Sequence, residues 1–298
     1  MLTAACNNVR ALLASATATL LLSCLGWTQV EGIHAPEKAT AGSAVTLASE
    51  GSGEGNLYLV APDQTSSRQV KVGESMQLSP DQTRAAGRYL AILCAAKTEG
   101  CKSASFWIDA DKVSSLSFIV HPSRVPVGRG DSISGVVFSF DRYQNLVMAR
   151  APVQFRLSSG GKEILSRDVP LAGGVAWLRT SSGKNAGPAE LSASIGEVTA
   201  KRIVHEVASD PCNLRIKAER TGKGLAVETE PVRDCAGNPV PDGTVVTFTK
   251  TDAAGKATVD APIKRGIARA EMTSSGNAVI SVASGVVIGN ELRLGEGR

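Results

Sequence analysis

The chain has 298 residues, of which 43% are hydrophobic and 20% charged, with a formal net charge of +4. Lysine, arginine, aspartate and glutamate are interspersed without long runs of like charge, which gives no reason to expect binding to nucleic acid. The 30 glycines, 13 prolines and few aromatic residues favour many short strands joined by turns.

The N-terminus has the pattern of an export signal. Arg10 precedes an apolar run, residues 11–22, which is too short to span a bilayer. The run ends in Leu21-Leu22-Ser23-Cys24, which resembles the bacterial lipobox, the motif whose cysteine receives a lipid. We therefore expect a lipoprotein signal peptide at 1–23, lipidation of Cys24 and a short tether at 24–32. Cleavage without lipidation and a retained helix are the alternatives.

The cysteine count fits export. The six cysteines are Cys6, Cys24, Cys94, Cys101, Cys212 and Cys235. Processing would remove Cys6 and assign Cys24 to the anchor, which leaves four cysteines in two local pairs. In an oxidising compartment we expect the disulfides Cys94–Cys101 and Cys212–Cys235, with four buried free thiols as the alternative. Neither spacing is typical of a zinc site.

Cys212 and Cys235 frame a predicted hairpin. They lie symmetrically about Lys223-Gly224, between expected strands at 212–219 and 225–234. We therefore expect antiparallel pairing to place the two cysteines opposite each other.

Residues 33–110 form the first of three segments of similar length. The composition of residues 44–47 and 57–60 predicts early strands. Ala86-Gly87-Arg88-Tyr89 resembles the tyrosine corner of Ig-like domains, in which the phenol ties a loop back to its strand. Tyr89 and Cys94 have opposite parity and should face opposite sides of a regular strand, so a cross-sheet disulfide at Cys94 is not expected.

Residues 111–207 and 208–294 repeat one motif. A shift of 93 residues aligns Asp141, Asn145, Val147 and Phe155 with Asp234, Asn238, Val240 and Phe248. A fixed period of this length indicates one folding unit used twice. Residues 134–140, 189–195, 244–249 and 278–282 alternate in strand fashion, and no stretch after residue 30 has sustained helical periodicity. The sequence predicts an all-β chain of three tandem immunoglobulin-like (Ig-like) β-sandwiches at 33–110, 111–207 and 208–294, with a tail at 295–298.

The repeated Asp-x-x-x-Asn-x-Val, followed by Val-x-Phe and Gly-x-Ala, resembles bacterial Ig-like domains of the intimin/invasin type. The resemblance covers the second and third segments and is clearest in 208–294. We expect the Asp and Asn of each copy to cap a turn through bonds to backbone amides, and the Val and Phe to enter the core. In that family such domains are spacers or stalks of surface proteins.

No residues suggest catalysis. The three histidines, His34, His121 and His205, lie far apart, and no Ser-His-Asp set, paired carboxylates or phosphate-binding glycine loop stands out. We therefore expect no enzyme activity, cofactor or metal. Residues 128–132 include Arg129-Gly130-Asp131, the integrin-recognition tripeptide, but a plain turn needs the same glycines, and we interpret the segment as a turn.

Together these features predict a non-catalytic, lipid-anchored protein of the cell surface or envelope, adhesin-like, acting as a binding module or spacer. Leu25, the residue after Cys24, is not the aspartate that retains lipoproteins at the inner membrane, so in a Gram-negative cell we expect the outer membrane by analogy. The expected partners are the membrane, through the anchor, and an unidentified protein or polysaccharide. The alternatives are a filament or secretion-assembly subunit that self-associates through sheet edges, and a carbohydrate-binding envelope protein. With three Trp and three Tyr, an exposed aromatic platform for sugar is not expected.

Overall fold

The computed structural model describes residues 29–97, 100–222, 224–274 and 276–295. Strands make up 64% of the described residues and helix 2%, which confirms the predicted all-β class. The short 3-10 helix η1 spans Pro80–Thr83. Cys6, Cys24 and the predicted signal peptide lie outside the described residues. No helix in the described part is long and apolar enough to cross a membrane.

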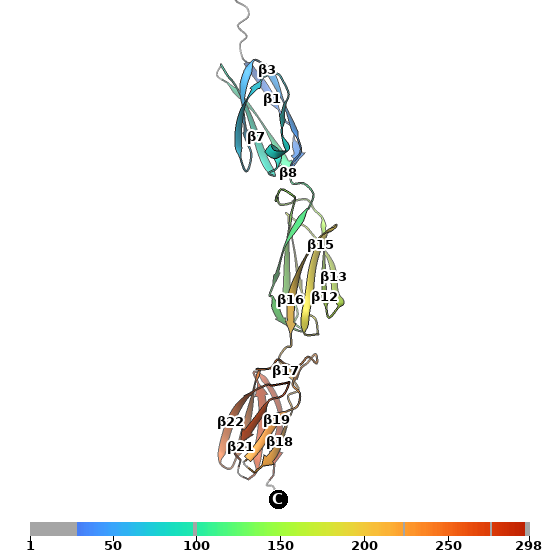
Figure 1. Ribbon diagram of the computed structural model, residues 1–298, viewed down its shortest axis with the longest axis vertical. Helices are drawn as coiled ribbons and strands as arrows, with labels where there is room; N and C mark the ends of the chain where they lie inside the picture. The colour runs from blue at the N-terminus through green and yellow to red at the C-terminus, as the bar shows by residue number, and fades with distance from the viewer. Residues whose placement is uncertain (1–28, 98–99, 223, 275, 296–298) are drawn as a thin grey trace, which may run out of the picture. The chain divides into compact units, whose positions relative to one another are not determined.

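Among the described residues, the first of two compact units contains those from Gln29 to Ser114 together with Phe140–Val147. A three-stranded sheet, β1-β3-β6, faces a five-stranded sheet, β2-β8-β7-β4-β5 (Figure 1). The strands are β1 (Gln29–His34), β2 (Lys38–Thr40), β3 (Val45–Ser52), β4 (Glu54–Val60), β5 (Thr65–Lys71), β6 (Met76–Leu78), β7 (Gly87–Ala95) and β8 (Cys101–Asp109). Alternate residues of β3 and β7 are buried, as a strand with one face on a core requires.

The tether prediction is wrong at its C-terminal end. Strand β1 begins at Gln29 rather than at Ile33, because Gln29 and Val30 pair with Ser52 and Gly51 of β3.

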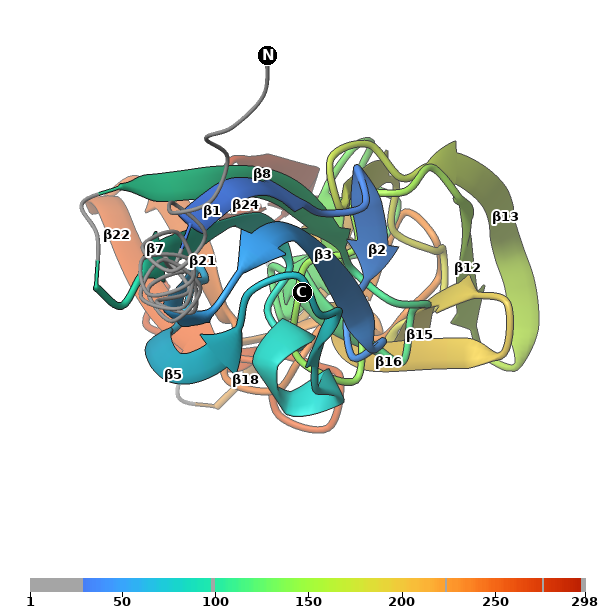
Figure 2. The same ribbon diagram turned by 90° about the horizontal axis from the view of Figure 1, so that it is seen from above.

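The second unit contains two further pairs of sheets. In the first of these, β10-β16-β15-β12-β13 faces β14-β11-β9. The strands are β9 (Ser115–His121), β10 (Arg124–Pro126), β11 (Ile133–Phe140), β12 (Pro152–Ser159), β13 (Lys162–Pro170), β14 (Val175–Thr180), β15 (Gly187–Ile195) and β16 (Val198–Val207). We call this pair the middle sheet pair. Strand β13 is an edge strand beside β12 (Figure 2).

In the last pair, β22-β21-β24-β25 faces β18-β19-β23, and β17-β20 forms a two-stranded ribbon. The strands are β17 (Pro211–Cys212), β18 (Ile216–Thr221), β19 (Gly224–Thr229), β20 (Arg233–Asp234), β21 (Val245–Asp252), β22 (Gly255–Pro262), β23 (Arg269–Met272), β24 (Ala278–Ser284) and β25 (Val287–Leu294).

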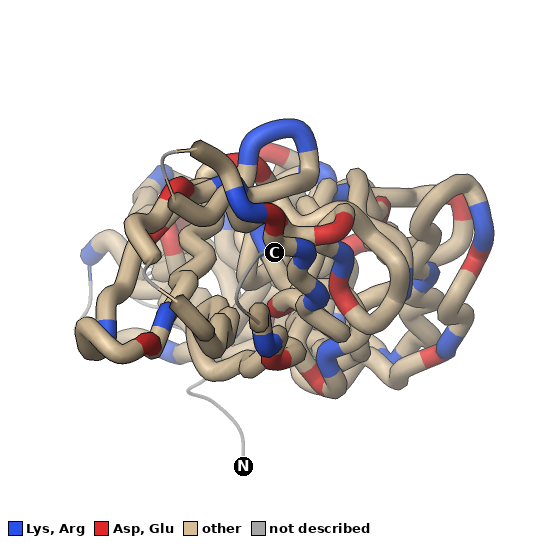
Figure 3. Tube along the Cα trace, turned by 90° about the horizontal axis from the view of Figure 1, so that it is seen from below, with Lys and Arg blue, Asp and Glu red and all other residues tan. Residues whose placement is uncertain are grey.

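Buried apolar side chains of the described residues form three separate clusters, one for each pair of sheets. Tyr89 and Phe106 stack in the first, Phe118 and Phe155 meet in the second, and Phe248 lies in the third. Because the second and third clusters share one compact unit, the count of three domains stays a prediction. Basic and acidic residues are interspersed along the trace (Figure 3).

Candidate functional site

The repeated motif forms a turn built around a buried carboxylate. Asp141 is 0% exposed. Its Oδ1 accepts hydrogen bonds from the backbone N–H groups of Tyr143 (2.8 Å) and Asn145 (2.9 Å), and its Oδ2 accepts one from the N–H of Asp111 (2.9 Å). A carboxylate that binds amides two and four residues ahead closes a tight turn and satisfies its own charge.

The second copy repeats this geometry. Oδ1 of Asp234 accepts hydrogen bonds from the N–H groups of Ala236 (2.9 Å) and Asn238 (2.8 Å), and Oδ2 accepts one from the N–H of Ser209 (3.1 Å). We call the two structures the Asp–Asn turns; they comprise residues 141–145 and 234–238.

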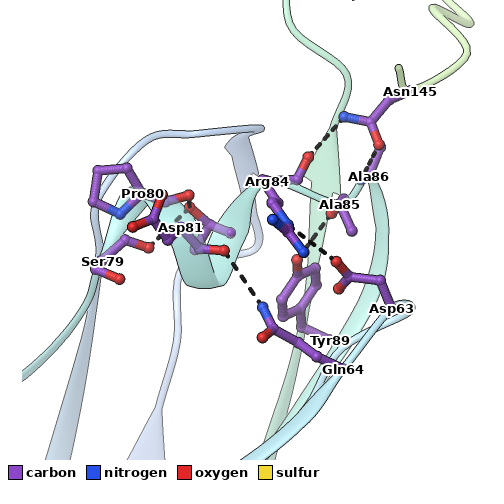
Figure 4. A network of polar contacts seen from close by, with 11 residues as sticks. Asp63, Gln64, Ser79, Pro80, Asp81, Arg84, Ala85, Ala86, Tyr89 and Asn145 are labelled. Carbon is purple, nitrogen blue, oxygen red and sulfur yellow. Dashed lines mark hydrogen bonds and ion pairs between the residues drawn. The ribbon is translucent and has the colours of Figure 1, made fainter. Parts of the chain in front are cut away.

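The asparagine of each turn has a role that the sequence did not indicate. We expected it to cap its own turn through backbone amides, but its side chain bonds to a loop more than 50 residues earlier. Nδ2 of Asn145 donates to the Arg84 carbonyl (2.7 Å), and its Oδ1 accepts from the Ala86 N–H (2.8 Å) (Figure 4). One amide thus satisfies a carbonyl and an N–H of the loop that precedes β7.

Asn238 makes the same pair of bonds to the loop that precedes β15. Its Nδ2 donates to the Lys184 carbonyl (2.8 Å), and its Oδ1 accepts from the Ala186 N–H (2.8 Å). Nδ2 also donates to Asp234, as Nδ2 of Asn145 does to Asp141, so each aspartate orients the amide that docks on the loop.

The two receiving loops are held by different means. In the first, the Tyr89 hydroxyl donates to the Ala85 carbonyl (2.9 Å), which is the predicted tyrosine-corner contact (Figure 4). Burial, with the nearby Asp63 carboxylate, raises the pKa of Tyr89 to about 12, so the phenol keeps its proton.

The loop that precedes β15 has no tyrosine of this kind and is held instead by a buried carboxylate. Glu206 is 2% exposed; its Oε2 accepts from the Ser159 hydroxyl (2.5 Å), and its Oε1 accepts from the Gly183 N–H. Glu206 was not among the residues predicted from the sequence. The available signal was its position two residues after Val204, on the inward side of β16.

The carboxylates of both turns are held ionised. Burial pushes the pKa of Asp141 up, but hydrogen bonds from Asn145, Asp111 and Tyr143 outweigh it, and the pKa lies below its ordinary value. The same balance applies to Asp234: burial raises its pKa, and hydrogen bonds from Asn238, Ser209 and Ala236 lower it further than burial raises it.

The apolar residues of the motif are buried. Phe155 and Phe248 are 0% exposed, and Val147 and Val240 are 5% and 4% exposed. Val240 and Phe248 belong to the last cluster and Phe155 to the middle one.

Both predicted cysteine pairs lie at bonding distance, with S–S separations of 2.06 Å for Cys94–Cys101 and 2.07 Å for Cys212–Cys235. Cys94 and Cys101 are direct partners on β7 and β8. The expectation that Cys212 and Cys235 lie opposite each other is wrong. Thr221 pairs with Gly224, and this register places Cys212 opposite Arg233.

Three further predictions concern the segment 128–132, exposed aromatic residues and metal sites. The segment 128–132 is an exposed turn, in which the Arg129 N–H donates to the Ser182 hydroxyl (2.9 Å). No aromatic platform for sugar was expected; two single tryptophans, Trp107 in one compact unit and Trp177 in the other, are 52% and 65% exposed. No group of three or more His, Cys, Asp or Glu suited to a metal occurs within the described ranges.

Comparisons with known proteins place the fold. The chain is similar in structure to FdeC, an adhesin of Escherichia coli, with a TM-score of 0.58, 14% identity, and coverage of 89% of this chain and 95% of that chain. Two further solved structures both have a TM-score of 0.48. Invasin, a bacterial integrin-binding protein, has 11% identity over 88% of this chain and 59% of that chain; InvD of Yersinia pseudotuberculosis has 10% identity over 91% and 97%.

Neither a protein-family model nor a curated protein matches the chain. At 14% identity the likeness to FdeC concerns fold alone. The chain therefore has the all-β, Ig-like fold of bacterial adhesins, as the sequence predicted.

Proposed function

We propose that this protein is an exported, non-catalytic, adhesin-like module of the cell envelope, held to the membrane by a lipid on Cys24, that displays Ig-like sandwiches for binding. The fold shared with FdeC supports a binding role at the cell surface. The lipobox-like Leu21-Leu22-Ser23-Cys24 supports the anchor.

The observation that carries the spacer part of the proposal is the repeated docking by asparagine. Asn145 and Asn238 each use a single amide to satisfy two backbone groups of a loop more than 50 residues earlier in the chain, within the same compact unit. Two copies of the same tie between a turn and a distant loop suit a spacer built from repeated sandwiches.

Self-association through sheet edges is a weaker candidate. The edge strands β5, β13 and β22 carry exposed cations, among them Arg68, Arg167 and Lys256, and β13 and β22 end in Pro170 and Pro262. Charge and proline on an edge strand oppose the addition of a further strand.

The anchor is tested by labelling cells with a radioactive fatty acid and separating membrane from soluble protein. We expect Cys24→Ser to abolish labelling and release the protein into the soluble fraction. Cys6→Ser is the matched control, because Cys6 would be removed with the signal peptide. Equal labelling of both variants would refute lipidation at Cys24.

A further inference from the structure

The middle sheet pair has a hollowed side between the edge strands of its two sheets. Two hollows, of about 630 and 670 Å³, are lined by residues of β13 and β14 and share Asp131, Arg167 and Arg179. Because the hollows share three residues, they form one continuous surface, which we call the β13–β14 groove.

The register of β13 turns two of its cations toward the core side of the sheet. Arg167 pairs with Phe155, and Lys162 pairs with Ser159; both partners on β12 are buried. Directly paired residues of antiparallel strands share a face, so Arg167 and Lys162 lie on the inward face of an edge strand. Residues 162 and 167 are an odd number of positions apart and would face opposite sides of a regular strand. The bulge leaves Ile164 without a partner on β12, and this extra residue brings Lys162 to the same face as Arg167.

Four cations line the groove: Lys162, Arg167, Arg179 and Lys184. Within the described part of the chain, none of the four has a carboxylate oxygen within 4.0 Å, whereas neighbouring Arg156 pairs with Glu163 at 3.9 Å. Asp131 is the one acidic residue in the lining. The groove therefore carries a local excess of positive charge, and it favours an anionic ligand.

An exposed indole lies beside these cations. Trp177 lines the second hollow with Arg167 and Arg179, and it is 65% exposed. On β14 the residues Trp177 and Arg179 share one face, while Ala176 and Leu178 point into the core. An indole gives a flat apolar surface for the face of a sugar ring, and guanidinium groups bind sulfate or carboxylate oxygens in pairs.

We propose that the β13–β14 groove binds a polyanionic polysaccharide, a chain of sugar rings that carries sulfate or carboxylate groups. The four cations bind the acidic groups, Trp177 stacks on a ring, and the hydroxyls of Thr180 and Ser181 reach ring oxygens from the same lining. The proposal deepens the adhesin-like function and rests on it only for access to such chains at the cell surface.

An acidic peptide added as an extra strand fits the groove less well. Strand addition needs a free, flat edge, but β13 has a bulge at Ile164, inward-facing cations at Lys162 and Arg167, and Pro170 at its end. These are the features that protect an edge from further strands. Protection alone would explain the cations of β13, but not Arg179 and Lys184, which come from other segments and line the same hollow.

The test measures binding of the purified full chain to heparin and to polygalacturonate, with neutral dextran and polyglutamate for comparison. Arg167→Glu/Arg179→Glu should weaken polysaccharide binding about tenfold or more, since two exposed ion pairs become repulsions. Arg124→Glu/Arg202→Glu makes the same charge change on β10 and β16, at the opposite end of the same sheet from β13, and should retain binding. Trp177→Ala should weaken binding without changing its salt dependence.

Binding of either acidic polysaccharide that is lost only in the groove variants supports the site, and preference for one identifies the acidic group. Equal loss in both double variants, equal binding of polyglutamate, or no binding of any acidic polysaccharide overturns it. Circular dichroism checks that each variant folds. If the Arg167→Glu/Arg179→Glu variant does not fold, the Trp177→Ala variant still tests the site, because Trp177 is exposed and its removal should leave the fold intact. A Cys24→Ser chain that still binds would separate this site from the anchor.

Discussion

Asn145 and Asn238 each belong to a tight turn and also form hydrogen bonds with a loop that is distant in the sequence. Their amides each donate to one carbonyl and accept from one N–H of that loop. An aspartate could fill the same volume but could not donate, so the shape of the turn alone does not account for asparagine at this position.

We expect Asn238→Asp to lower the free energy of unfolding by about 1–3 kcal/mol, because it leaves the Lys184 carbonyl without its donor and sets a second carboxylate against Asp234. Urea denaturation measures the change. Asn185→Asp is the matched control, since this exposed asparagine makes no side-chain hydrogen bond found among the described residues. An equal loss in the two variants would argue against docking by Asn238.

The lowered pKa of Asp141 and Asp234 predicts a dependence of stability on pH. A carboxylate whose pKa is lower in the folded chain stabilises it above the ordinary value of 3.8, and this contribution is lost as the pH falls through the lowered folded value. We expect urea midpoints to fall below about pH 4. Asp234→Asn should be less stable at pH 7 and lose less on acidification; an identical pH profile would contradict the assignment.

At the level of strands, the alternation of the sequence predicted most of what the structure contains. Residues 134–140 and 278–282 alternate in the sequence and lie in β11 and β24 with alternate residues buried. The register of the Cys212–Cys235 hairpin could not be predicted, because symmetry about Lys223-Gly224 does not fix which residues close the turn; a shift of one residue there displaces every pair.

The hydrogen bonds of Asn145 and Asn238 to distant loops could not be predicted from the sequence either. Arg84 and Asn145 are 61 positions apart in the sequence. The groups that Asn145 binds are the Arg84 carbonyl and the Ala86 N–H, and because every residue type has a backbone carbonyl, and every type except proline an N–H, the residue types there do not indicate the contact. Likewise, the groove cations look like ordinary surface charges until strand pairing shows that Arg167 lies opposite the buried Phe155.

The disulfide that closes the longer loop should contribute more to stability, although the contribution grows only with the logarithm of loop length. By chain entropy, a closed loop with a separation of 23 residues contributes about 3.4 kcal/mol, and one with a separation of 7 contributes about 2.5 kcal/mol. Cys212→Ser/Cys235→Ser should therefore lose more stability than Cys94→Ser/Cys101→Ser in urea denaturation. Alkylation without reduction should modify none of the four cysteines in the wild-type chain; modification of all four would show that the bridges do not form.

For the whole molecule, the proposed role depends on display outside the cell. Three clusters of buried side chains, two Asp–Asn turns and the Ig-like fold shared with FdeC are the structural features on which the proposed role at the cell surface rests. The proposed role requires export, because an adhesin-like protein that remains in the cytoplasm cannot reach a ligand outside the cell.

The most direct measurement is brief protease treatment of intact cells, followed by mass spectrometry of the released peptides. We predict peptides from each of the three segments, 33–110, 111–207 and 208–294, at a time when a cytoplasmic marker protein remains uncut. Release of these peptides only after the cells are broken open would contradict display at the surface, and with it the proposed function.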